Sequence, residues 1–246
     1  IENPGWSLRI IQDMIVKTFR ECGLDYHHTN AFAYIKDRNT YKEVRRHQKN
    51  SSKWFYKTDI KDFFGSTTVE MIMDQLSKMY PFQTMMQLDA NREMIENVIR
   101  LYCTKDGHLP TGAITSPMIS NLIMVPFDYE LTKKCRERRW VYTRYADDIE
   151  ISSKQRLNEK EVTNIVKETF NEVGLQYEIN YDKTAVRSIN GSNWIRGLML
   201  NQQGNITIGR KNIDWIKASI YQFIQDENQG KTWEKTRIRQ FLGKLS

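Results

Sequence analysis

Two adjacent carboxylates, Asp147 and Asp148, lie between two short runs rich in aromatic and β-branched residues. The composition of residues 140–144 and 149–152 is typical of strands, so the carboxylates are predicted at the tip of a β-hairpin. Neighbouring like charges repel each other unless a cation neutralises them. Successive side chains of a strand point to opposite faces, which prevents both from gripping one ion equally. The pattern therefore predicts a cation site completed by a third carboxylate, with an acidic turn in water as the simpler alternative.

Asp59 is the candidate third carboxylate. It directly follows residues 54–58, an aromatic run that predicts a strand. An acidic residue at the end of a strand can be presented to a ligand at the edge of a sheet, and Mg²⁺ prefers such carboxylate oxygens. For Asp59 alone, a solvated acid at a strand end is the alternative.

A loop at residues 109–115 carries Gly112 and precedes Ser116 and Pro117. Serine at the cap and proline in the first turn predict a long helix that is kinked at Pro126. The basic run that ends this helix favours a helix C-terminus and could also contact nucleic acid. Capping signals and hydrophobic periodicity predict further helices over 6–21, from a Thr67–Glu70 capping box to Met79, 89–102, 158–173, 213–224 and 233–245, and strands over 175–179, 194–200 and 205–208.

Composition limits the partner and the compartment. Lys and Arg total 37 against 30 Asp and Glu, and this net charge of +7 favours a polyanionic partner. The three cysteines are odd in number and widely spaced, which indicates a reducing compartment and no zinc motif. No apolar run approaches the roughly 20 residues that cross a bilayer, so we expect a cytoplasmic protein without a membrane partner. The chain starts at Ile1 and stops within a helical pattern, so we expect it to be part of a longer protein.

These motifs, in this order, resemble the fingers and palm of reverse transcriptases, specifically the bacterial group that includes retron and group II intron enzymes. Residues 55–64 match the family's first acidic motif, residues 109–122 its nucleotide-pocket motif and residues 144–148 its acidic hairpin. Weaker matches occur at residues 1–4, 8–12, 180–184 and 197–198. The resemblance implies an α+β fold with the fingers and palm of a right-hand polymerase, an antiparallel palm sheet packed on helices, and a thumb that is missing or truncated.

The same resemblance divides the chain into parts. Residues 1–53 would form fingers, and residues 54–66 would form the palm strand with the first acidic motif. The remaining parts would be fingers and palm helices at 67–108, palm at 109–210, and the end of the palm with the start of a thumb or connection at 211–246.

The resemblance implies an RNA-directed DNA polymerase that uses an RNA template, a DNA or RNA primer and deoxynucleoside triphosphates. Two Mg²⁺ ions, for which Mn²⁺ could substitute, would support an in-line phosphoryl transfer. Asp59 and Asp147 would bridge the ions, and the Ile60 carbonyl would ligate the ion on the nucleotide side. Asp148 would support the site with less direct coordination. Lys183 would protonate the leaving pyrophosphate, with a solvated lysine as the alternative.

Further residues are assigned to the nucleotide by the resemblance. Phe64 would close off the ribose 2′-OH position and so select deoxynucleotides, with a core phenylalanine as the alternative. Gly112 would let the backbone approach the nucleotide. The other predicted nucleotide contacts are Asp62, Thr111, which stands where many relatives have glutamine, and Arg9, which could equally pair with a local carboxylate.

Two stretches depart from the pattern of retron enzymes. Those enzymes typically carry Asn-Ala-x-x-His before the first acidic motif and Val-Thr-Gly after the lysine motif. Here residues 43–47 read Glu-Val-Arg-Arg-His and residues 195–197 read Ile-Arg-Gly. A noncoding RNA partner, a fused or associated domain, and a role in antiphage defence or a group II-like system therefore all stay open. The alternative functions are template-independent or protein-primed DNA synthesis on the same fold, and a catalytically silent nucleic-acid-binding scaffold.

Overall fold

Four antiparallel strands form the central sheet of the computed structural model, which describes residues 4–245. The strands follow the order β2-β3-β1-β4 across the sheet. The predicted antiparallel sheet is therefore confirmed, and the strand that carries Asp59 lies in its interior. The bounds are β1 (Trp54–Asp59), β2 (Val141–Tyr145), β3 (Asp148–Ser153) and β4 (Ala185–Ser188).

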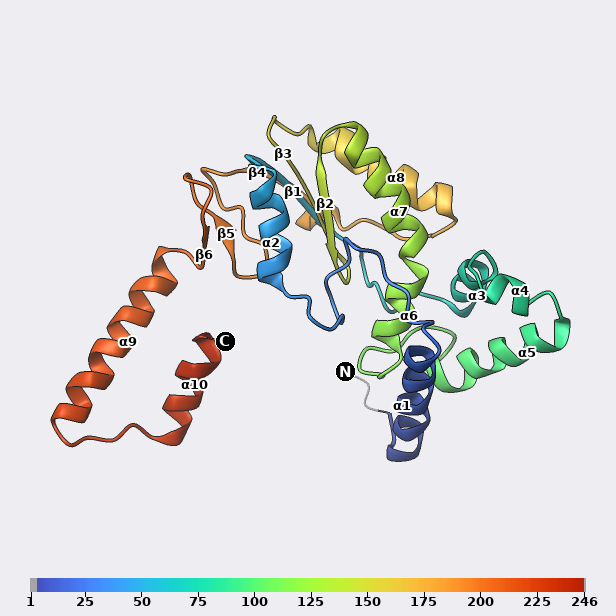
Figure 1. Cartoon of the computed structure of the whole chain (residues 1–246), viewed down its shortest axis with the longest axis horizontal. Coiled ribbons are helices and arrows are strands. Elements are labelled where there is room, and N and C mark those ends of the chain that lie inside the picture. Colours follow the sequence, from blue (N-terminus) through green and yellow to red (C-terminus); the bar gives the residue numbers. More distant parts are fainter. Residues whose placement is uncertain (1–3, 246) are drawn as a thin grey trace.

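Helices cover both faces of this sheet (Figure 1). On one face lie α7 (Val125–Glu137) and α8 (Glu159–Val173), whose Phe127 and Phe170 stack with ring centroids 4.1 Å apart. Tyr56 of β1 is fully buried on this face and its hydroxyl lies 2.9 Å from Thr163 Oγ1 of α8. On the other face, α2 (Thr40–Lys49) contributes Val44 to a small cluster with Phe55. Alternate residues of β1 thus serve two separate apolar contacts, as the period of a strand requires.

A second group of helices lies beside the sheet (Figure 1). Gln12 connects three of its parts: its amide nitrogen donates to the Tyr102 carbonyl over 2.9 Å, and its amide oxygen accepts from Ile114 N–H over 3.2 Å. This buried glutamine ties the first helix to the loop at residues 109–115. The helices are α1 (Trp6–Glu21), α3 (Val69–Ser77), α4 (Phe82–Met85), α5 (Asp89–Val98), the π-helical turn η1 (Ile99–Cys103) and α6 (Ser116–Ile123).

The C-terminal helices α9 (Arg210–Asn228) and α10 (Lys235–Leu245) extend away from the sheet as a pair (Figure 1). Trp233 joins them, because its indole N–H donates to Asp226 over 2.7 Å and its ring meets Phe241 edge-on. The hairpin of β5 (Met199–Leu200) and β6 (Ile206–Thr207) precedes them. Within residues 4–245, no helix combines the length and hydrophobicity that crossing a membrane would require.

The helix predicted from Ser116 is interrupted beside Pro126 as expected, but by a full break at Met124 in place of a kink, so that the structure has two helices, α6 and α7. Pro126 explains the break: it cannot donate to the carbonyl four residues earlier and its ring clashes there. Ser116 is also not the cap but the first helical residue, and its hydroxyl donates to the Pro110 carbonyl over 2.8 Å.

The capping residue of α3 is Thr68 and not the predicted Thr67. The Thr68 hydroxyl accepts from Met71 N–H over 3.2 Å, whereas Thr67 is buried and its hydroxyl contacts the Tyr177 hydroxyl at 2.7 Å. Two adjacent threonines both match the capping signal, and the sequence does not indicate which one caps α3 because the position of Thr67 depends on the distant Tyr177.

The predicted strand over residues 175–179 is also wrong. This segment makes a single bridge, between Ile179 and Ile60, where it crosses the end of β1. Its alternating apolar side chains are buried in the core, which produces the period of a strand without a ladder. The fourth strand of the sheet is β4, whose residues have no such alternation.

Candidate active site

The sheet brings the predicted carboxylates together at the ends of β1 and β3. Asp59 and Asp148 are directly opposite each other in the β1–β3 ladder. Ile60 N–H, one residue beyond β1, donates to the Asp147 carbonyl over 3.1 Å. The register of a single antiparallel pair therefore places the first acidic motif beside the acidic hairpin, as the sequence predicts.

The hairpin tip has only two loop residues, Ala146 and Asp147. Ala146 has φ of 56°, a left-handed conformation that the first loop position of such a tight hairpin adopts and that costs energy for a residue other than glycine. Arg144 Nη1 donates to the Ala146 carbonyl over 2.9 Å. This contact holds the strained turn in place, and it thereby fixes the peptide that joins Ala146 to Asp147.

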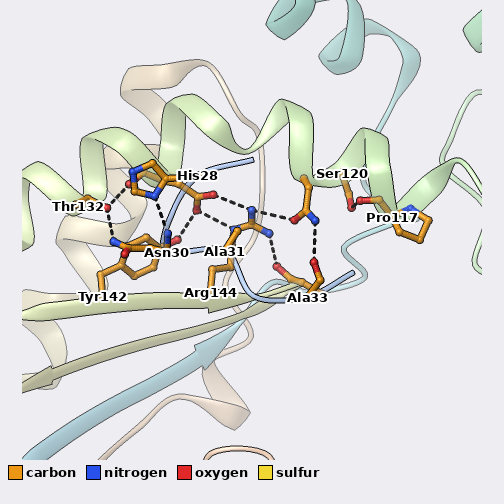
Figure 2. Close-up of polar contacts among 12 residues, drawn as sticks. His28, Asn30, Ala31, Ala33, Pro117, Ser120, Thr132, Tyr142 and Arg144 are labelled. Carbon is orange, nitrogen blue, oxygen red and sulfur yellow. Dashed lines mark hydrogen bonds and ion pairs between the residues drawn. The ribbon is translucent and has the colours of Figure 1, made fainter. Parts of the chain in front are cut away.

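Arg144 is itself held by a buried network under the hairpin (Figure 2). Its Nε and Nη2 each donate over 2.8 Å to a different oxygen of Asp128 on α7, and both side chains are fully buried. The Tyr142 hydroxyl donates to Asp128 Oδ1 over 2.6 Å, and Asn121 Oδ1 accepts from Arg144 Nη2 over 3.3 Å. Burial lowers the pKa of Arg144, but the negative charge of Asp128 more than offsets this and raises it, so the guanidinium stays charged. Sequence reasoning missed Asp128, although a lone acid beside Phe127 on the apolar face of a helix was the available signal.

Asp59 has one oxygen paired and one oxygen free. Its side chain is buried, and Oδ2 accepts from Lys183 Nζ over 2.6 Å. Oδ1 is also buried but has no hydrogen-bond partner. Because an unpaired buried carboxylate oxygen is costly, this atom indicates a position that a cation would stabilise.

Asp147 is half-buried and its pKa is raised, first by burial and then by the negative charges of Asp148 and Asp59. In the part of the chain that the structure describes, Asp147 forms no ion pair. Its ionised form is therefore disfavoured until positive charge reaches it. Asp59 Oδ1 and Asp147 together fit a divalent cation.

Asp148 differs from Asp147 because cations of the chain already face both of its oxygens. Arg196 Nη1 donates to Oδ2 over 2.9 Å, and Lys57 Nζ lies 3.5 Å from Oδ1. Among residues 4–245, no three Asp, Glu, His or Cys side chains converge as ligands of one ion in this arrangement. Asp59 and Asp148 instead face lysine and arginine partners here.

The residues that sequence reasoning assigned to the nucleotide differ in exposure and backbone conformation. Ile60 is buried, whereas Asp62 is exposed in a turn with φ of 45°. Phe64 is half-buried against the core, its ring centroid 5.5 Å from that of Phe63. Gly112 is exposed with φ of 114°, a conformation that requires glycine. Thr111 is exposed beside it, and Arg9 is exposed on α1.

A hollow of about 820 Å³ opens between α1, the loop at residues 25–38 and the start of α6. Burial raises the pKa of Tyr34 in its lining, and the negative charge of Asp147 raises it further, so this residue lies within electrostatic reach of the hairpin. Arg20, Lys36 and Arg38 in the lining outnumber Asp13 and Asp25, and Asn121 contributes from α6. Sequence reasoning treated this stretch only as a basic run, since its approach to the hairpin depends on the fold.

A family model described as reverse transcriptase (RNA-dependent DNA polymerase) matches residues 1–243. The chain belongs to the reverse transcriptase family. The resemblance to bacterial, retron-like reverse transcriptases is thereby confirmed. The retron Ec73 reverse transcriptase from Escherichia coli is 28% identical over 228 residues, which cover 89% of this chain and 70% of the relative. The retron Ec86 reverse transcriptase, also from Escherichia coli, is 27% identical over 241 residues, which cover 97% of this chain and 65% of the relative.

Solved structures support the fold of this reverse transcriptase family member. The apo telomerase from Candida tropicalis truncated from its C-terminal domain superposes with a TM-score of 0.51 at 14% identity. The match covers 82% of this chain and 44% of the telomerase chain, so the chain spans less than half of that protein. At this identity the match shows the fold alone, and it confirms the predicted α+β fingers and palm. The match to the family at residues 1–3 lies outside the described residues.

Proposed function

We propose that this chain is an RNA-directed DNA polymerase that adds deoxynucleotides to a primer at Asp59 and Asp147. The observation that carries the proposal is the unpaired, buried Oδ1 of Asp59 beside an Asp147 whose pKa is raised. A cation between the two carboxylates would give Asp59 Oδ1 a partner and would favour the ionised form of Asp147. A family membership that covers nearly the whole chain supplies the reaction class.

The donor set suits Mg²⁺, because carboxylate and carbonyl oxygens are its preferred ligands. Asp59 and Asp147 would hold two ions, with Mn²⁺ as a substitute, and the Ile60 carbonyl would complete the nucleotide side. When bound, the ions supply charge neutralisation at the attacking and leaving oxygens of the phosphoryl transfer. Asp148, which Arg196 and Lys57 already face, would orient the hairpin and coordinate less directly.

Lys183 contributes a proton donor next to the carboxylates. Its hydrogen bond to Asp59 raises its pKa, so the ammonium form is maintained at neutral pH. The side chain is exposed, and its Nζ contacts only one edge of Asp59 in this structure. An ammonium in this position would neutralise Asp59 in the free protein and would protonate the leaving pyrophosphate during the reaction.

The substrates follow from the same site. An RNA template, a DNA or RNA primer and deoxynucleoside triphosphates are the partners of this reaction, and the basic lining of the hollow beside Tyr34 suits their phosphates. Phe64 would exclude the ribose 2′-OH, and Asp62, Thr111, Gly112 and Arg9 are the remaining proposed nucleotide contacts. The names of the relatives favour a retron-like setting.

Primer extension on an RNA template, on a DNA template and without template tests this function. The wild type should extend on RNA, and Asp147→Asn should lose extension while keeping the fold. Asp106→Asn is the matched control, because Asp106 is an exposed acid in a turn with φ of 51°, which asparagine tolerates. Equal synthesis by wild type and Asp147→Asn would remove the metal-site assignment. Products without template would replace templated synthesis with untemplated synthesis, and no synthesis by the wild type would favour a silent scaffold.

A further inference from the structure

Arg196 lies in a tight turn whose backbone conformation is costly. Ile195 and Leu198 exchange two backbone hydrogen bonds, of 2.7 and 3.0 Å, around the central residues Arg196 and Gly197. Both central residues have positive φ, 46° at Arg196 and 86° at Gly197. Such a turn favours asparagine or glycine at its first central position, and an arginine there is disfavoured. Side-chain contacts must therefore offset the cost at Arg196.

The Arg196 guanidinium makes those contacts with two carboxylates at once. Nε donates to Glu43 Oε2 over 3.0 Å, Nη2 donates to Glu43 Oε1, and Nη1 donates to Asp148 Oδ2 over 2.9 Å. The same group lies over the Tyr145 ring, 4.6 Å from its centroid. One planar fork thus joins helix α2, the turn at residues 195–198 and the first residue of β3.

Glu43 is the anchor of this arrangement. It is fully buried on α2, and its only cation is Arg196 within residues 4–245, while the Thr143 hydroxyl donates to Oε1 over 3.0 Å. A buried carboxylate is strongly destabilising unless a cation lies beside it in good geometry. Glu43 therefore holds the Arg196 guanidinium in place. Because the bidentate contact uses Nε and Nη2, Nη1 is left to face Asp148.

We propose that Arg196, anchored by Glu43, is a positioning residue that fixes the Asp148 carboxylate and weakens the negative potential at Asp59 and Asp147. The inference rests on the proposed metal site at those two carboxylates. Its consequence is that the metal affinity of the site is set partly by a residue that ligates nothing. Residues 43 and 196 are two of the four positions, with 44 and 195, at which the sequence departs from the retron-typical motifs, and the structure shows that these two residues contact each other.

Mn²⁺ binding to the protein without nucleic acid or nucleotide tests the electrostatic part, with free Mn²⁺ measured by electron paramagnetic resonance. Arg196→Gln should bind Mn²⁺ more tightly, on the order of tenfold, because one positive charge near a divalent ion is removed. Arg156→Gln is the matched control. Arg156 also lies over an aromatic ring, 5.5 Å from the centroid of Trp54, but Trp54 begins β1 whereas Asp59 ends it. The control should leave Mn²⁺ affinity unchanged.

The double variant Glu43→Asn with Arg196→Thr tests the positioning part and avoids leaving Glu43 buried without a cation. It removes one negative and one positive charge, so Mn²⁺ affinity should stay within about twofold of wild type. The kcat of primer extension should nevertheless fall, with little change in the nucleotide KM, because Asp148 has lost the group that orients it. If Arg196→Gln does not fold, this double variant alone decides the question.

The outcomes separate the inference from the function on which it rests. If Asp147→Asn binds Mn²⁺ as wild type does, the proposed metal site itself is wrong. If Asp147→Asn weakens Mn²⁺ binding but Arg196→Gln matches Arg156→Gln in both Mn²⁺ affinity and kcat, the role of Arg196 is overturned. A double variant with wild-type kcat would also overturn it.

Discussion

Asp147 carries the most direct chemical expectation at the scale of single residues. Its pKa is raised by burial and by Asp148 and Asp59, so a proton competes with a metal ion for this carboxylate. The protonated fraction falls as pH rises, and the Mg²⁺ concentration for half-maximal extension should therefore fall as pH rises from the acid side toward neutrality. Initial rates across a Mg²⁺ titration at each pH measure this. A half-saturation that does not change with pH would contradict it.

Glu150 is expected to make the stability of the folded protein, and not its catalytic rate, depend on pH. Burial raises its pKa to about 8, although Lys57 Nζ lies 3.5 Å away. Between its ordinary value of 4.5 and 8, the folded state holds a proton that the unfolded state has lost, so stability should decrease as pH rises through this window. His47, whose pKa burial lowers to about 3, acts in the opposite direction only below about 6.5, so the slope is measured above that pH.

Thermal unfolding of wild type and Glu150→Gln from pH 6.5 to 8.5 measures this slope. The wild-type midpoint should fall with pH, and the amide variant should show a flatter profile because it has no proton to lose. Parallel profiles would show that Glu150 is ionised in the folded protein.

Phe64 is the residue whose role depends on an absent substrate. It is half-buried beside Phe63, so both a core role and a role at the nucleotide fit its position. Phe64→Ala should raise ribonucleotide incorporation relative to deoxynucleotide incorporation, because the side chain would no longer fill the space of a 2′-OH. Competition between the two nucleotide types measures the ratio. Unchanged sugar selectivity would assign Phe64 to the core alone.

At the scale of elements, the buried pair under the hairpin is the main support of the site. Asp128→Asn leaves Arg144 buried without its partner and should cost about 3–5 kcal/mol in the free energy of unfolding. Glu172→Gln is the control on the same helix pair: its partner Lys134 lies 2.6 Å away, but the glutamate is 53% exposed, so the loss should stay below about 1 kcal/mol. Chemical denaturation measures both, and similar losses would contradict the role of the buried pair.

Elements with local signals were predictable from the sequence, and those that depend on distant partners were not. Helix α8 follows its signals, since Asn158 caps it and Gly174 ends it with φ of 79°. Helix α2 lies in a stretch that appeared only polar and basic, and its buried side, including Glu43 and His47, is explained by the sheet it covers. The strand β4 likewise shows no periodicity of its own.

The candidate site divides in the same way. Asp59, Asp147 and Asp148 are identified by motif and order, because a strand end and a hairpin tip are local features. The residues that hold them, Asp128 under Arg144 and Glu43 behind Arg196, are joined by contacts across distant parts of the chain. No spacing in a single sequence indicates such pairings.

At the scale of the whole molecule, the account rests on how the sheet divides its two faces. One face packs on α7 and α8 (Figure 1) through apolar side chains and the buried pair of Arg144 and Asp128. The opposite face presents Asp59, Asp148 and Lys57, and Arg196 reaches Asp148 from the turn at residues 195–198. A net charge of +7 on the chain suits a nucleic-acid partner for the charged face. The fold thus places Lys57, Lys183 and Arg196 beside the carboxylates of the site.

The most direct test of the central claim is the rate of a single nucleotide addition on an RNA template by Asp147→Asn and Asp148→Asn. Asp147 has no ion pair in the described part of the chain, whereas Asp148 is held by Arg196 and Lys57. Asp147→Asn should reduce the rate at least as severely as Asp148→Asn, while both variants stay folded. A larger loss in Asp148→Asn, or a wild-type rate in Asp147→Asn, would contradict it.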